Sequence, residues 1–96
     1  VVHVSTAVRV EAGWDRTDPT AAHTNGLLRA RDVDLDADAA DLAVRIRARC
    51  NVSVVDASLG AAIAALPDPV VVITSDPHDV RAMATAIGRS VNIVTL

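Results

Sequence analysis

The chain has 96 residues and a formal net charge of −3, and Trp14 is the one aromatic residue in a sequence that is 51% hydrophobic. This length gives one small domain with an aliphatic core, and the negative charge argues against a protein that holds nucleic acid by a broad positive surface. The single cysteine excludes an intrachain disulfide, no apolar run reaches the roughly 18 to 20 residues that span a bilayer, and no signal-peptide pattern is present, so we expect a cytoplasmic protein.

The first half of the sequence alternates apolar strands with helices marked by capping residues. Ser5 is a suitable N-cap for the first helix, and Asp36 or Asp38 is suitable for the third. Apolar residues after Asp38 recur at i, i+3, i+4 and i+7, which indicates one buried helix face. The expected elements are strands at 1–4 and 31–35, helices at 6–14 and 19–28, and a helix from the Asp36 or Asp38 cap up to a break at 50–53.

The second half is predicted to hold a helix, a strand, a second helix and a final strand. Ser53 caps the first of these helices, and Pro67 stops it. The continuous apolar run that starts at Val70 is typical of a buried parallel strand. Gly88 is expected to end the last helix. The expected elements are helices at 54–66 and 77–87, a strand from residue 70 and a strand at 91–95, which together predict a single α/β domain over residues 1–96.

Four acidic residues lie where such a fold gathers ligands. Asp76 and Asp79 follow the Val70 strand, and binding sites of open α/β sheets lie at the carboxyl ends of their strands. Asp56 falls in the first turn of the preceding helix, and Glu11, the only glutamate of the chain, lies on the first helix. Each also has a structural explanation: Asp56 as a helix-dipole partner, Asp76 as a helix cap and Glu11 as solvated surface.

Two segments carry a family resemblance. Val55-Asp56-Ala57-Ser58-Leu59 and, after a helix, Val71-Val72-Ile73-Thr74-Ser75-Asp76-Pro77-His78-Asp79-Val80 resemble the second half of a PIN domain, the nuclease fold of VapC-type toxins from toxin–antitoxin pairs. Residues 5–14 resemble the helix that carries the glutamate of the family, which corresponds to Glu11. The resemblance covers nearly the whole chain and implies a small parallel-sheet domain flanked by helices.

The chain departs from the family at its beginning. A PIN domain starts with a strand that ends in an aspartate, followed by a helix, and this sequence starts at the second strand of the family. The first β-α unit and the first catalytic aspartate are therefore expected to be missing. In the family that strand lies between those that correspond to the Val1 and Val70 runs. Three arrangements are open: direct pairing of these two strands, a segment supplied by another chain, or a fragment of a longer protein.

The resemblance implies metal-dependent hydrolysis of RNA phosphodiester bonds. The residues implied as catalytic are Glu11, Asp56, Asp76 and Asp79, and the residues implied as metal ligands are Glu11, Asp56 and Asp76. Clustered carboxylates repel one another, so Mg²⁺ or Mn²⁺ would stabilise them and would lower the pKa of a bound water. Asp79 would be a ligand or a nearby base. The expected substrate contacts are Thr74, Ser75 and Arg9, with Arg16 and Arg81 as alternatives to Arg9.

Three functions from different classes remain open. The first is a ribonuclease toxin that forms a homodimer, pairs with an antitoxin protein, contacts no membrane and is active once the missing aspartate is restored. The second is a non-catalytic PIN remnant that acts as a protein-interaction or self-association module. The third is an unrelated small α/β binding domain, such as a receiver-like module. The absence of lysine argues against a receiver, because that class needs a lysine late in its sequence.

Overall fold

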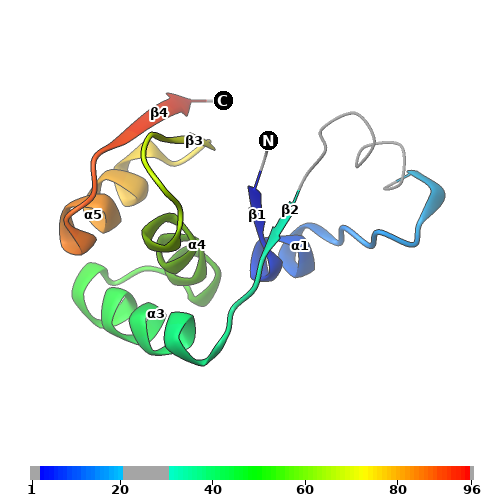
Figure 1. The fold of residues 1–96 in the computed structure, drawn as a ribbon, viewed down its shortest axis with the longest axis horizontal. Helices are drawn as coiled ribbons and strands as arrows, with labels where there is room; N and C mark the ends of the chain where they lie inside the picture. Colours follow the sequence, from blue (N-terminus) through cyan, green and yellow to red (C-terminus); the bar gives the residue numbers. More distant parts are fainter. Residues whose placement is uncertain (1–2, 21–30, 96) are drawn as a thin grey trace.

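The computed structural model describes residues 3–20 and 31–95. Its elements in chain order are β1 (His3–Ser5), α1 (Thr6–Ala12), β2 (Arg31–Val33), α3 (Ala37–Cys50), α4 (Val54–Ala65), β3 (Val70–Thr74), α5 (Pro77–Ile87) and β4 (Val91–Thr95). Figure 1 shows the resulting arrangement. The predicted α/β class with parallel strands is confirmed. The helix predicted at 19–28 begins at Pro19 and Thr20, and the rest of it lies outside the described residues.

The strands form two separate sheets in the described ranges, and this corrects the expectation of one sheet. β1 pairs in parallel with β2, and β3 pairs in parallel with β4 with Val70 opposite Val91 and Thr74 opposite Thr95. Direct pairing of the Val1 and Val70 runs is therefore wrong as far as the described strands go, because β1 and β3 belong to different sheets. The two other arrangements, a strand from another chain and a fragment of a longer protein, stay predictions.

Helix α4 lies at the centre of the molecule and packs against elements of both sheets (Figure 1). It contacts α1 and β1 on one side and α3 and α5 on the other, and its Ile63 packs with Val70 and Val72 of β3. The close approach depends on small residues. A Cβ on Gly60 would lie 3.0 Å from Met83 Sδ and 3.1 Å from Ile46 Cδ1. The two sheets are thus joined through one tightly packed helix.

Capping residues set most helix boundaries where the sequence predicts them. The side chains of Asp36, Ser53 and Asp76 accept hydrogen bonds from backbone amides of the first turns of α3, α4 and α5. These bonds satisfy amides that have no partner inside the helix. Gly88 ends α5 with a φ of 69°, a left-handed conformation that favours glycine. The helix starts that carry Asp56, Asp76 and Asp79 are therefore formed where the sequence predicts them.

Helix α1 ends earlier than predicted. It stops at Ala12 and not at Trp14, because Gly13 adopts a left-handed conformation with a φ of 66°. The amide of Trp14 then donates back to the carbonyl of Arg9 at 2.9 Å, which closes the helix end. Trp14 consequently belongs to the loop that follows α1.

Strand β3 is buried on one face only, which corrects the prediction of a fully buried strand. Val70 and Val72 are each 6% exposed and lie against α4 and α5, whereas Val71 is 57% and Ile73 60% exposed. In the neighbouring strand β4, Val94 pairs with Ile73 and is 50% exposed. We call Val71, Ile73 and Val94 the open sheet face. In the part of the chain that the structure describes, no helix is long and apolar enough to cross a membrane.

Candidate carboxylate site

The connection from β3 to α5 holds two of the predicted acids. Asp76 is the N-cap of α5, and its Oδ1 accepts a hydrogen bond from the backbone amide of Asp79 at 3.3 Å. The hydroxyl of Thr74 accepts from the amide of Asp76 at 3.0 Å. These two bonds define the path of the chain at the carboxyl end of β3 and place the Asp76 and Asp79 carboxyl groups next to each other.

Asp56 reaches the same region from a different element. It lies in the first turn of α4, where its amide donates to the Ser53 hydroxyl at 3.0 Å, and it is half-buried. The negative charge of Asp56 acts on Asp79 together with that of Asp76. Three of the four predicted acids are thus electrostatic neighbours, and both helix starts involved are formed by predicted caps.

The pKa of Asp79 is raised above its ordinary value. The largest cause is its side-chain hydrogen bond to Asp76, which requires a proton, followed by partial burial and by the negative charges of Asp76 and Asp56. The charge of His78 acts in the opposite direction and does not overcome them. Carboxylates that raise the pKa of a neighbour in this way lack sufficient compensating positive charge.

The geometry limits how a metal ion is held. Within residues 3–20 and 31–95, no three Asp, Glu, His or Cys side chains stand close enough together to coordinate one ion. Mg²⁺ keeps several of its waters and is commonly bound through one or two carboxylates together with phosphate oxygens of a substrate.

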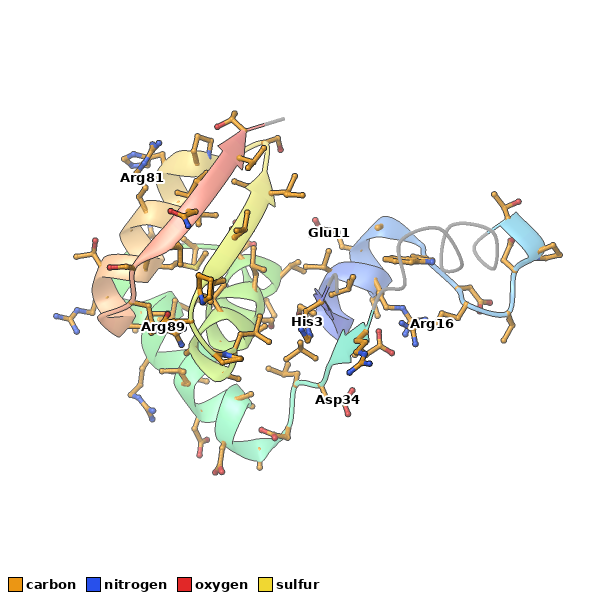
Figure 2. All side chains as sticks on the ribbon, turned by 45° about the horizontal axis from the view of Figure 1, so that its top comes forward. His3, Glu11, Arg16, Asp34, Arg81 and Arg89 are labelled. Carbon is orange, nitrogen blue, oxygen red and sulfur yellow. The ribbon has the colours of Figure 1, made fainter. Side chains whose placement is uncertain are left out.

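Glu11 is not brought into this group. Its side chain is exposed on α1 (Figure 2), and it is not among the charges that shift Asp79. Arg9 is engaged elsewhere, because its Nη1 lies 3.0 Å from Asp32 Oδ2 and its Nη2 donates to the carbonyl of Trp14 at 3.3 Å. The roles predicted for Glu11 as a metal ligand and for Arg9 as a substrate contact stay predictions.

The other predicted substrate contacts differ in availability. Thr74 already accepts the Asp76 amide, and Ser75 is exposed beside it. Arg16 pairs with Asp32 at 3.3 Å. Arg81 is exposed on α5 (Figure 2). Of these four residues, Ser75 and Arg81 are the ones whose side chains are exposed and make no hydrogen bond or ion pair with the described residues.

Two half-buried sets of arginine contacts were not predicted from the sequence. Asp32 joins Arg9 and Arg16, and Arg89 donates from Nη1 to the carbonyls of Ile63 and Ala64 at the end of α4. These partners are far apart in the chain, and no local pattern links them. The arginines stabilise the fold at positions away from the carboxylates.

Comparisons with known proteins give no match for this chain, neither among models of protein families nor among curated proteins or solved structures.

Proposed function

We propose that this chain is the carboxylate-bearing part of a metal-dependent ribonuclease, similar to the toxins of toxin–antitoxin pairs. Asp76 and Asp79 would hold hydrated Mg²⁺ or Mn²⁺ with Asp56 beside them. The ion, when bound, supplies charge neutralisation and a more acidic water for phosphodiester hydrolysis. RNA is the proposed substrate. The proposed partners are an antitoxin protein and a second copy of the chain, and the proposed location is the cytoplasm.

The observation that carries the proposal is the unneutralised negative charge at the carboxyl end of β3. The hydrogen bond to Asp76, burial and the charges of Asp76 and Asp56 raise the pKa of Asp79, and the charge of His78 offsets them only in part. β1 and β3 belong to different sheets, and each has one edge unpaired by any described strand. A strand from another chain beside β3 remains part of the proposal.

Calorimetric titration with Mn²⁺ at pH 7 tests the proposal. We expect saturable binding to the chain, loss of that binding in Asp76→Asn, and binding at least about tenfold weaker in Asp56→Ala, because charge near the ion contributes to its affinity. Asp41→Asn is the matched control, since Asp41 is an exposed acid on α3. Binding that is equally strong in all three variants, or absent from the parent chain, contradicts a metal site at these acids.

A second candidate function is a non-catalytic PIN remnant that acts as a protein-interaction or self-association module. It is favoured by the open sheet face, where Val71, Ile73 and Val94 are between 50% and 60% exposed. Parallel sheets usually have both faces covered. Sedimentation over a range of protein concentrations separates the two functions when read beside the titration: an interaction module associates and binds no Mn²⁺.

A further inference from the structure

The second half of α3 carries a concentration of positive charge that the proposed site does not use. Arg45, Arg47 and Arg49 occur within five residues and are all exposed. We call them the α3 arginines. None of them forms an ion pair with the described residues, in contrast to Arg9 and Arg89. This local excess is notable in a chain whose formal net charge is −3.

The helix geometry arranges the α3 arginines around its exposed half. Ile46 and Ala43 are buried and define the face of α3 that packs on α4 and α5. Arg45 and Arg49 are four positions apart, so they share one side of the helix with a separation of about 6 Å along its axis. Guanidinium groups bind phosphates through paired hydrogen bonds and lose little hydration energy in doing so. Such spacing suits successive phosphates of a nucleic-acid strand.

A short loop joins the end of α3 to the helix that carries Asp56. α3 ends at Cys50 and α4 begins at Val54, and the first turn of α4 contains Asp56. The thiol of Cys50 lies 3.7 Å from the carbonyl of Ala82, so the end of α3 also packs against α5, the helix that Asp76 caps. The C-terminal end of α3 is thus separated from the start of α4 by three residues of the chain and packs against the middle of α5.

We propose that the α3 arginines bind the phosphate backbone of the RNA substrate, and this inference rests on the proposed ribonuclease function. Charge complementarity is the reason for this occupant, because free guanidinium groups on an exposed helix have no anionic partner in the described chain. The competing explanation is purely structural: positive residues in the last turn of a helix interact favourably with its dipole. The two explanations differ in which measured property changes when the charges are removed.

The test measures binding of a fluorescein-labelled single-stranded 12-nucleotide RNA by anisotropy, in EDTA so that no metal is needed. Arg45→Gln/Arg49→Gln is compared with Arg31→Glu, which changes the net charge by the same two units at an exposed arginine on β2. We expect the α3 double variant to weaken binding at least about tenfold at low salt and to reduce the salt slope by about 1.4, since each phosphate contact contributes about 0.7 for single strands. Arg31→Glu should weaken binding less than threefold.

Three results overturn the inference. Equal losses of RNA affinity in Arg45→Gln/Arg49→Gln and in Arg31→Glu indicate a general effect of net charge. Unchanged RNA affinity with a lowered melting temperature indicates that the α3 arginines act on the helix dipole only. Absence of RNA binding by the parent chain contradicts RNA as the ligand of the α3 arginines. Failure of the inference is separable from failure of the proposed function, because a parent chain that binds Mn²⁺ at Asp76 but is insensitive to the Arg45 and Arg49 changes contradicts the inference alone.

Discussion

At the scale of single residues, Asp79 should make the folding stability of the chain depend on pH. Its pKa is raised in the folded chain by Asp76, by burial and by Asp56. The folded state therefore binds more protons than the unfolded state between the ordinary pKa and the raised one, so the contribution of Asp79 to stability becomes less favourable as the pH rises through that interval. We expect the melting temperature of the parent, relative to Asp79→Asn, to rise as the pH falls from 7 to 4.

The control for this prediction is Asp41→Asn, which removes an exposed acid on α3 that is not among the charges acting on Asp79. Melting followed by circular dichroism at half-unit pH steps is sufficient. An offset in melting temperature between Asp79→Asn and the parent that does not change with pH would mean that Asp76 and Asp56 exert no repulsion on Asp79.

The positions of Asp56, Asp76 and Asp79 at helix starts could be predicted from the sequence, because Ser53 and Asp76 cap these helices through local contacts with residues three positions ahead.

At the scale of secondary-structure elements, β3 has two faces of different energetic weight. Val72 is 6% exposed and packs with Ile63, whereas Val71 is 57% exposed. Val72→Ala should cost about 2 kcal/mol in free energy of unfolding, because it removes buried methyl groups and leaves a cavity. Val71→Ala should change it by less than about 0.5 kcal/mol. Urea denaturation of both variants checks this, and equal costs would mean that the open sheet face is covered in solution.

The difference between these faces explains why the strand was predicted correctly and its burial was not. A continuous apolar run predicts β3 at its observed position. The same run of residues is compatible with a strand that is covered on both faces and with one that is covered on one face only. Which face is covered depends on elements distant in sequence, here α4 and α5. The same limit applies to the division into two sheets, because strand pairing is a long-range property that apolar periodicity does not encode. Arg89 at the end of α4 is missed for this reason as well.

At the scale of the whole molecule, α4 should make unfolding a single transition. Trp14 reports on the part formed by β1, α1 and β2, while circular dichroism is dominated by the helices, and α4 contacts both parts. We expect the fluorescence and dichroism transitions in urea to coincide. Gly60→Ala should lower both urea midpoints together, because its methyl group would crowd Met83 and Ile46 at a cost of about 1 kcal/mol in unfolding free energy. A fluorescence transition at lower urea than the dichroism transition would show that the two parts unfold independently.

The hydrogen bond from the Asp79 amide to Asp76 Oδ1 has one more consequence. A cation that draws Asp76 Oδ1 toward itself takes that oxygen away from the amide, so ligand binding and order in the first turn of α5 oppose each other. Occupancy of the site is then reported by the exchange of one backbone proton with solvent deuterium. The Asp79 amide should exchange faster when the cation is bound, while amides in the middle of α5 keep their rates.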